Sequence, residues 1–217
     1  MSGEIMGAAP SARLDVTAVR RGDITAKRRF DDAAKRVLDV VVAATLLVVL
    51  LPLIVAVSMA IKAGSRGPVF FRCRRVGLGA TGLKILKFRK MRDGVSGSPL
   101  TTSDDDRLTS VGRFLAKSKI DEIPQLWNVV QGDMSLVGPR PERPEFADTF
   151  ARSISGYTLR HAARPGLTGL AQVSGEYSSE PEIKLRYDLA YLNNWSFFLD
   201  LAILLRTLPV VLTRRGI

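Results

Sequence analysis

The sequence predicts an α+β protein that is mainly helical, with an N-terminal re-entrant membrane helix broken at Pro52 and a small cytoplasmic globular domain with interfacial amphipathic helices. Three observations support this prediction. A long apolar run near the N-terminus contains a proline and has basic residues on both sides. Short β-branched and aromatic segments between glycines follow it, together with segments of helical periodicity. A last apolar run is interrupted by charges.

Composition divides the chain into three parts. Residues 1–29 are small, polar and increasingly basic, and we predict that they form a mobile basic tail. Residues 30–64 contain the long apolar run and are predicted to form the re-entrant membrane helix. Residues 65–217 are mixed in composition and are predicted to form the cytoplasmic domain, which ends in an interfacial helix. A chain of 217 residues, 46% of them hydrophobic, is long enough for one domain plus a membrane element.

The apolar run covers the 25 residues from Val37 to Ile61, more than the roughly 20 that cross a bilayer. Both flanks are basic, and basic flanks favour the cytoplasmic side. Pro52 removes one backbone hydrogen bond and clashes with the preceding turn, so it bends the helix. A helix that enters one leaflet, turns at Pro52 and leaves by the same face satisfies both constraints. A kinked spanning helix is the alternative; the length of the run disfavours a cleaved signal peptide.

The globular part begins with two extended segments, at residues 67–77 and 83–93, which are predicted to be strands. A Gly/Ser/Asp loop follows at residues 94–107. Two helices are then predicted, at residues 108–118 and 121–131, and the second ends before a glycine.

The C-terminal segment, residues 180–217, is apolar, but Asp200 and Arg206 interrupt it. It is therefore predicted to be amphipathic and to lie in the membrane interface, with Trp195 at the level of the lipid head groups.

The net charge of +11 predicts an acidic partner: nucleic acid, anionic lipid or a phosphorylated substrate. Nucleic acid is the least favoured, because only 7% of residues are aromatic and no nucleic-acid module is recognisable. The single cysteine, Cys73, is predicted to be a buried thiol in a reducing compartment. The single histidine, His161, lies among cations and is predicted to be structural, which disfavours a catalytic triad.

Two adjacent acids, Asp121 and Glu122, precede an apolar helical pattern, and they have two interpretations. In the first, Asp121 caps the helix, Glu122 lies at the positive end of its dipole, and Pro124 occupies the first turn. In the second, a carboxylate attacks phosphorus while the helix N-terminus binds the phosphate group. Both interpretations can hold at once.

Cations are needed near these acids if the substrate is an anion, and two stretches supply them. Lys87 and Arg89 belong to "KFR", and Arg140 and Arg143 belong to "GPRPERP". Arg140 lies between two prolines, so it loses less conformational freedom on binding. Its planar guanidinium also matches the oxygens of a phosphate group.

Five stretches behind the proline-broken helix together resemble the bacterial sugar transferases. These are the monotopic phosphoglycosyl transferases that begin lipid-linked glycan assembly. The resemblance covers about residues 30–217 and rests on the order and spacing of "GPVFFRCRRVG", "KFRKMR", "DEIPQLWNVVQGDMSLVGPRPE", "RPGLTGLAQVSG" and "YDLAYLNNWSFFLDLAILLRT".

This resemblance implies a sugar-1-phosphate transferase that moves a sugar 1-phosphate from a UDP-sugar to polyprenol (undecaprenyl) phosphate and releases UMP. It implies Mg²⁺ as cofactor, with Asp121 as the expected metal ligand. Asp121 is also expected to attack the sugar-proximal phosphorus and form a phosphosugar-aspartyl intermediate. Glu122 is expected to assist by proton transfer or metal positioning.

The resemblance also assigns residues that bind substrate phosphate. Arg140 matches the family's Pro-Arg-Pro element and Lys87 its Lys-Phe-Arg element, in which Arg89 is the neighbouring cation. Asp188, in "RYDLAYLNN", is a further candidate, for which helix capping is the alternative role.

The expected location is the bacterial inner membrane, with the catalytic domain, residues 65–217, on the cytoplasmic face. Membrane lipids are expected partners and nucleic acid is not. A homodimer is compatible with the resemblance. The segment at residues 157–175 is more similar to members that act on UDP-glucose or UDP-galactose in exopolysaccharide, capsule or O-antigen assembly than to members that use modified diamino sugars. The resemblance does not assign one sugar or one pathway.

Two positions depart from the family pattern. The turn before the acids commonly carries an arginine and a serine where this chain has Ala116 and Lys119. Lys117 or Lys119 are the candidates that replace the arginine. The membrane helix often breaks at Ser-Pro, whereas Leu51 precedes Pro52 here, and leucine has no hydroxyl for the carbonyl that the proline frees.

Two other functions are compatible with parts of the sequence. One is a membrane-tethered scaffold that binds anionic lipid without catalysis, which an Asp121→Asn substitution would leave functional. The other is a glycosyltransferase that moves sugar without phosphate, which would release UDP instead of UMP.

Overall fold

The computed structural model describes residues 26–92, 94, 105–174 and 180–213. This part of the chain is mainly helical with two small sheets, as the sequence predicts. Most of the predicted tail (1–29) and most of the predicted loop (94–107) lie outside the described residues. The helices have these bounds: α1 Ala26–Val49, α2 Leu51–Gly64, α3 Ser110–Ser118, α4 Gln125–Gln131, α5 Pro144–Ser153, α6 Leu170–Val173, α7 Pro181–Asn194 and α8 Phe197–Thr213.

The apolar run forms a bent helix pair. Helices α1 and α2 meet at Leu50 with a bend of 59°, two residues before Pro52. Pro52 lies in the first turn of α2, where the proline's missing N–H costs least. No single described helix is long and apolar enough to cross a membrane, but the bent pair meets that test by length and composition.

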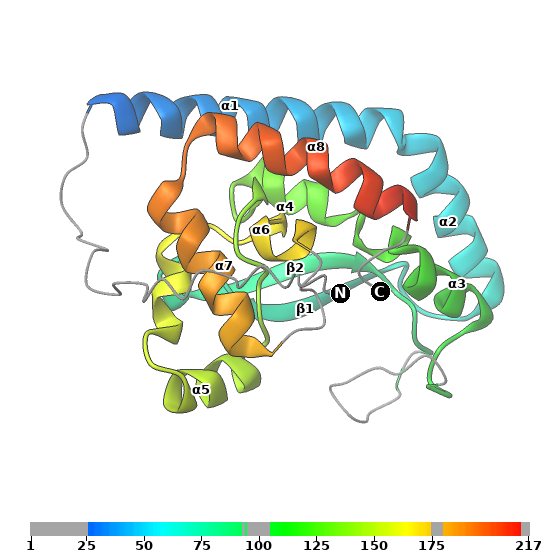
Figure 1. Ribbon diagram of the computed structural model, residues 1–217. Coiled ribbons are helices and arrows are strands. Elements are labelled where there is room, and N and C mark those ends of the chain that lie inside the picture. Colours follow the sequence, from blue (N-terminus) through cyan, green and yellow to red (C-terminus); the bar gives the residue numbers. More distant parts are fainter. Residues whose placement is uncertain (1–25, 93, 95–104, 175–179, 214–217) are drawn as a thin grey trace, which may run out of the picture.

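Strands β1 (Phe70–Val76) and β2 (Gly82–Phe88) form an antiparallel hairpin, in which Phe70 pairs with Phe88. A short helical turn, η2 (Leu78–Ala80), connects them, with Gly79 at a φ of 62° that favours glycine. Strands β3 (Ser135–Val137) and β4 (Gly166–Thr168) form a two-stranded parallel sheet. Figure 1 shows α1 and α8 running along one face of the molecule, with the β1–β2 hairpin below them.

The core consists of three clusters of buried apolar side chains. The largest joins α1, α4, β3 and α8 through residues such as Ala43, Val129, Val137 and Ile203. A second lies between α5, α7 and the turn η4 (Tyr157–Ala162). The third is where α2 packs on α3 through contacts that include Ile61 and Leu115. The apolar run is therefore attached to the globular part at both of its helices.

A buried polar network attaches α1 to α8. The Lys35 ammonium lies 2.5 Å from the Asp200 carboxylate, which also accepts hydrogen bonds from the Tyr191 hydroxyl and the Trp195 indole. Trp195 also packs against the largest core cluster. The structure therefore gives Trp195 an internal contact that the sequence did not indicate, because the position of its partner Asp200 depends on the fold.

Both helices also expose large apolar side chains outside this network. Large hydrophobic side chains on α1 and α8 are exposed, among them Val37, Val48, Phe198 and Leu205. An exposed contiguous apolar surface is typical of a protein that contacts lipid or another protein.

Candidate functional site

The two adjacent acids lie in a short turn between two helices. Thr109 caps α3 by accepting a hydrogen bond from the Gly112 N–H, and α3 ends at Lys119, whose φ of 59° is left-handed. Asp121 and Glu122 follow in the 3₁₀ turn η3 (Ile120–Glu122). The left-handed backbone of Lys119 is strained for a residue other than glycine, and such strain is often kept at functional sites.

The capping interpretation of Asp121 is wrong. Pro124, not Asp121, occupies the N-cap position of α4, and no side-chain oxygen caps that helix. The reason is the turn η3, which separates the acids from α4. Because the Asp121 carboxylate is not used for capping, its burial needs another explanation.

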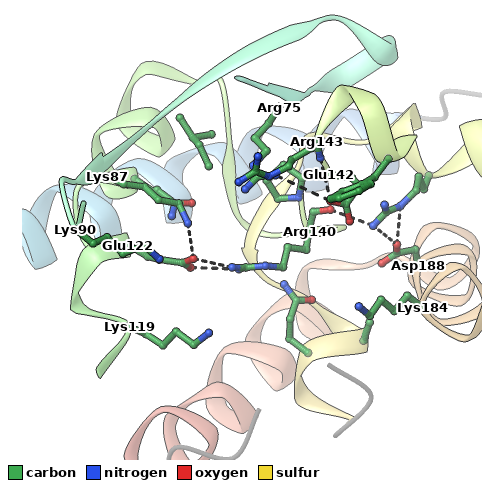
Figure 2. Close-up of a pocket in the computed structure, with 17 residues that line it drawn as sticks. Arg75, Lys87, Lys90, Lys119, Glu122, Arg140, Glu142, Arg143, Lys184 and Asp188 are labelled. Carbon is green, nitrogen blue, oxygen red and sulfur yellow. Dashed lines mark hydrogen bonds and ion pairs between the residues drawn. The ribbon is translucent and has the colours of Figure 1, made fainter. Parts of the chain in front are cut away.

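A cavity of about 360 Å³ opens beside the acids, and its wall is rich in cations. Figure 2 shows Lys87, Lys90, Lys119 and Glu122 on one side of Arg140, with Lys184 and Asp188 on the other. The lining residues with charged side chains are Arg75, Lys87, Lys90, Lys119, Glu122, Arg140, Glu142, Arg143, Arg160, Lys184 and Asp188. Such an excess of positive charge favours an anionic ligand.

Glu122 is held between two cations that are distant in sequence. The Lys87 ammonium lies 2.7 Å from Oε1 of Glu122, and the Arg140 guanidinium donates to both carboxylate oxygens at 2.6 and 3.2 Å (Figure 2). Arg140 and Lys87 more than offset the effect of burial and hold the pKa of Glu122 far below its usual range. Glu122 is therefore ionised at neutral pH, which favours metal or substrate positioning over proton transfer.

Asp121 is more deeply buried than Glu122, with 2% of its surface exposed, and it does not line the cavity itself. Lys90, which does line the cavity, lies 3.4 Å from its Oδ2. Burial raises the pKa of Asp121, and the charges of Lys90 and Lys87 only partly oppose this effect. A weakly stabilised carboxylate is more basic and hence a better nucleophile than an exposed one.

Lys87 and Arg89 do not share one site. The strand β2 ends at Phe88, so the alternation that would place both cations on one face stops there. Arg89 is buried and donates hydrogen bonds to Ser65 and to the carbonyl oxygen of Arg66, after α2. It does not line the cavity, so the structure assigns Arg89 to the chain after α2 and corrects the expectation that it binds substrate phosphate.

Asp188 lies at the cavity wall, but its carboxylate is paired with Arg160 at 2.7 Å. Arg160 in turn donates to the carbonyl oxygen of Arg140 at 3.0 Å. Asp188 is buried in the middle of α7, so the capping alternative is wrong, and an anion paired in this way is unsuited to direct phosphate contact. Asp188 instead positions Arg140 through Arg160.

The chain that carries Arg140 is fixed by close backbone packing. A Cβ atom at Gly138 would lie 2.4 Å from the carbonyl oxygen of Arg164, and one at Gly166 would lie 2.2 Å from the Gly138 nitrogen. Only glycine permits β3 and β4 to approach this closely. The two prolines beside Arg140 then stiffen the continuation of β3 toward the cavity.

Several cavity residues were missed by sequence reasoning. Lys90, the last residue of "KFRK", lines the cavity, whereas Arg89 does not. Knowing that β2 ends at Phe88 would have been needed to choose between these two cations. The buried Gln125 Nε2 and both amide atoms of Gln172 have no hydrogen-bond partner among the described residues, and both side chains line the cavity. Buried polar groups without partners are costly, so these two amides are well placed to contact a bound ligand.

The protein side chains at the site can bind a divalent cation only if a bound substrate supplies further ligands. No group of three or more His, Cys, Asp or Glu side chains lies together in the described part of the chain. Mg²⁺ is commonly held by one or two carboxylates, with substrate phosphates and water as the other ligands. Both oxygens of Glu122 are bound by Lys87 and Arg140, whereas Asp121 has one looser partner, Lys90. Asp121 is therefore the acid that would hold an ion arriving with a phosphorylated ligand.

Comparison with known proteins gives consistent matches. The family model described as "Bacterial sugar transferase" matches residues 30–214. A UDP-glucose:undecaprenyl-phosphate glucose-1-phosphate transferase of Caulobacter vibrioides is 46% identical over 75% of this chain and 63% of its own length.

A UDP-N-acetylgalactosamine-undecaprenyl-phosphate N-acetylgalactosaminephosphotransferase of Aeromonas hydrophila is 42% identical over 76% of this chain and 40% of its own length. The uncharacterized sugar transferase EpsL of Bacillus subtilis is 41% identical over 76% of this chain and 79% of its own length. The chain thus spans between about two-fifths and two-thirds of the length of the named phosphotransferases.

Proposed function

Because the chain belongs to the bacterial sugar transferase family, we propose that it is a phosphoglycosyl transferase that transfers a sugar 1-phosphate from a UDP-sugar to undecaprenyl phosphate and releases UMP. The named relatives carry this general reaction in their names. They differ in the sugar, which is glucose in one and N-acetylgalactosamine in the other, so the names leave the sugar of this chain open.

The observation that carries the proposal is an acid pair at a cation-rich cavity, with Glu122 in its wall and Asp121 buried directly behind Lys90. Glu122 organises Lys87 and Arg140, and Lys90 pairs with Asp121. A diphosphate brings several negative charges, and Lys87, Lys90 and Arg140 are the cations that pair with the two acids. Figure 2 shows Lys87 and Arg140 at Glu122. This arrangement is what phosphoryl transfer needs, since positioning and charge stabilisation account for most of its catalysis.

The reaction has two displacement steps on this proposal. First, an oxygen of Asp121 attacks the sugar-proximal phosphorus, the bond from that phosphorus to the bridging oxygen breaks, and UMP leaves with the electron pair. A phosphosugar-aspartyl intermediate results. Next, an oxygen of the anionic polyprenol phosphate attacks the same phosphorus, and the aspartyl oxygen leaves as a carboxylate. Neither step requires an added proton or oxidant.

Lys90 has a specific part in the first step. In the structure it lies between the cavity and the Asp121 carboxylate, and its side chain is 28% exposed. A bound diphosphate competes with Asp121 for this ammonium. As Lys90 turns toward phosphate, Asp121 loses its counter-ion and becomes accessible, so substrate binding itself activates the nucleophile.

Magnesium belongs to the proposal through the fit of Asp121 and Glu122. Asp121 is the expected protein ligand, and Glu122 fixes the cations around it. The bound ion would neutralise part of the diphosphate charge. Lys87 and Arg140 supply the remaining positive charge from the protein.

The bent pair α1–α2 supports a re-entrant membrane anchor on the cytoplasmic face of the inner membrane. Its exposed apolar side chains continue onto α8, where Phe198, Leu205 and Leu208 are exposed. Figure 1 shows α1 and α8 on the same side of the molecule. A polyprenol phosphate keeps its tail in the bilayer and its charge at the surface, so a shallow anchor places the cavity at the required depth.

Product analysis tests this function. The full chain, reconstituted in phospholipid nanodiscs with undecaprenyl phosphate and magnesium, is expected to release UMP from a UDP-sugar in step with a lipid-linked sugar phosphate. Release of UDP would show transfer of sugar without phosphate and would refute the proposal. Retention of the full cellular function by Asp121→Asn would instead indicate a scaffold.

A further inference from the structure

A second cavity, of about 350 Å³, adjoins the first on the side away from the acid pair. We call it the aromatic annex, and it is lined by Glu142, Phe146, Phe150, Tyr157, Arg160, Pro181 and Lys184. Four of these residues, Glu142, Phe146, Arg160 and Lys184, also line the first cavity. The two cavities therefore share one wall, and a long ligand can extend from one into the other.

The three rings of the annex are fixed in place. The Phe146 and Phe150 rings stack with centroids 6.3 Å apart, and the Tyr157 ring meets Phe150 edge-on at 5.4 Å. The Tyr157 hydroxyl accepts a hydrogen bond from Arg160 at 2.7 Å. Phe150 and Tyr157 belong to a core cluster, whereas Phe146 does not. Phe146 is thus the one aromatic side chain that lines both cavities. Its ring lies outside that core cluster.

The geometry of the proposed reaction determines where the leaving group lies. In a phosphoryl transfer the attacking and leaving oxygens are roughly in line through phosphorus. With Asp121 attacking from one end, the nucleoside monophosphate must extend away from it. Figure 2 places Glu122, the neighbour of Asp121 in the chain, on one side of Arg140 and Lys184 on the other. Lys184 and Glu142 belong to the wall that this cavity shares with the annex.

The chemistry of the annex matches a pyrimidine nucleoside. Aromatic side chains bind bases by stacking, and Phe146 offers a ring at the shared wall. Glu142 accepts hydrogen bonds and Lys184 donates them, which suits the N–H and carbonyl edge of uracil. The Glu142 carboxylate is itself held by the Arg143 N–H at 3.0 Å and by Arg75 at 4.0 Å.

The other apolar ligand of the reaction, the polyprenol chain, is a poor match. Figure 1 shows α5, which carries Phe146 and Phe150, on the opposite side of the molecule from α1 and α8. The exposed apolar faces that would meet lipid lie on those two helices. An isoprenoid tail in the annex would have to leave the bilayer and cross the globular part.

We propose that the aromatic annex is the nucleoside subsite of the enzyme, in which the uracil ring of the UDP-sugar stacks on Phe146 while Glu142 and Lys184 contact its polar edge. This inference rests on the proposed function, because the in-line argument assumes attack by Asp121. It assigns binding of the base to α5 and the start of α7, neither of which carries the attacking Asp121.

The test separates the base from the phosphates by competition. UMP and inorganic pyrophosphate are each measured as inhibitors of sugar-phosphate transfer by the full chain in nanodiscs. Phe146→Ala is expected to weaken inhibition by UMP and to raise KM for the UDP-sugar about tenfold, with kcat within twofold. Inhibition by pyrophosphate, which has no base, is expected to stay unchanged. Phe146→Leu provides the same comparison should the alanine variant not fold.

Two further variants sharpen the result. Phe146→Tyr keeps an aromatic ring and is expected to restore UMP inhibition to within about threefold. Asp148→Ala, on the exposed face of α5 and outside both cavities, is the matched control and is expected to change nothing.

Three outcomes overturn the subsite. They are unchanged UMP inhibition in both Phe146→Ala and Phe146→Leu, equal loss of UMP and pyrophosphate inhibition, and an effect that follows the sugar or the polyprenol length instead of the base. Each of these outcomes is interpreted only when the wild-type chain transfers sugar phosphate, so none of them contradicts the proposed function. Absence of UMP release by the wild-type chain would instead refute the function itself.

Discussion

Two clusters of buried acids and cations differ in how completely their carboxylates are paired. Where α1 meets α8, Asp200 receives Lys35 at 2.5 Å, the Tyr191 hydroxyl at 2.8 Å and the Trp195 indole at 3.3 Å. Behind the cavity wall, Asp121 is equally buried but pairs with the ammonium of Lys90 at 3.4 Å. The Asp200 carboxylate has three close partners within the fold. The Asp121 carboxylate has one more distant partner, Lys90, which lines the cavity.

The difference shows that burial of an acid does not by itself indicate chemistry. A fully paired carboxylate such as Asp200 connects elements, and removing its charge takes the ion-pair partner from the Lys35 ammonium. A carboxylate whose pKa is raised by burial, such as Asp121, costs stability in return for reactivity. The two clusters should therefore respond in opposite ways when the charge of the acid is removed.

Asp121→Asn is predicted to have the largest effect on activity and a stabilising effect on the fold. Loss of the attacking oxygen should lower kcat at least about 10³-fold, as expected for removal of a nucleophile. Stability should rise, because burial raises the folded-state pKa of Asp121 above its ordinary value of 3.8. That shift stabilises the fold below pH 3.8, and the benefit is lost as pH rises through the raised pKa.

At neutral pH the ionised Asp121 is therefore a net cost, and asparagine removes it. The expected change is therefore a rise in Tm, on a scale of roughly 2–4 °C per kcal/mol for a chain of this size. Steady-state kinetics and thermal unfolding in the same nanodiscs measure both quantities. A large fall in Tm would mean that Asp121 has a structural role like that of Asp200.

Asp200→Asn is predicted to have the largest effect on stability. It leaves the Lys35 ammonium, which is 17% exposed, without its counter-ion inside the protein. Removing one partner of a buried pair costs about 3–5 kcal/mol, or roughly 6–20 °C in Tm. The kcat of the folded fraction should stay within about threefold of wild type, since Asp200 does not line the catalytic cavity. An unchanged Tm would remove the contrast between the two clusters.

Arg140→Lys is predicted to have a smaller effect that is confined to the cavity. Lysine keeps the charge but loses the planar fork that spans both oxygens of Glu122. We expect KM for the UDP-sugar to rise about tenfold, in line with the loss of one charge-assisted hydrogen bond. Arg152→Lys, on the exposed surface of α5, is the control. Equal kinetics for the two variants would exclude bidentate recognition at Arg140.

Local sequence patterns predicted the parts of this structure that depend on neighbours in the chain. Pro52 predicted the bend, which lies at Leu50, and the glycine after residue 131 predicted the end of α4. The approach of Lys87 and Arg140 to the acid pair came from the family resemblance, and the structure brings them together at Glu122. Sequence alone contains no term for contacts between residues that are 18 or 35 positions apart.

The failures have the same cause. Arg89 was grouped with Lys87 because both belong to the stretch "KFR", but β2 ends between them. Asp188 was assigned to phosphate because Arg160, 28 positions away, could not be recognised as its partner. Of the two lysines expected to replace the family's arginine, Lys117 and Lys119, it is Lys119 that lines the cavity, and the replacement itself stays a prediction. The role of each residue therefore depends on the end of a strand or on a partner that is distant in sequence, and neither can be read from the local pattern.

The most direct test of the account is to look for the covalent bond on Asp121. The full chain in nanodiscs, incubated with a UDP-sugar but without polyprenol phosphate, is followed by intact mass and peptide mapping. The account predicts a mass increase of one sugar phosphate, located on Asp121, absent from Asp121→Asn and discharged when undecaprenyl phosphate is added. Transfer of sugar phosphate to lipid with no such adduct under single-turnover conditions would contradict it.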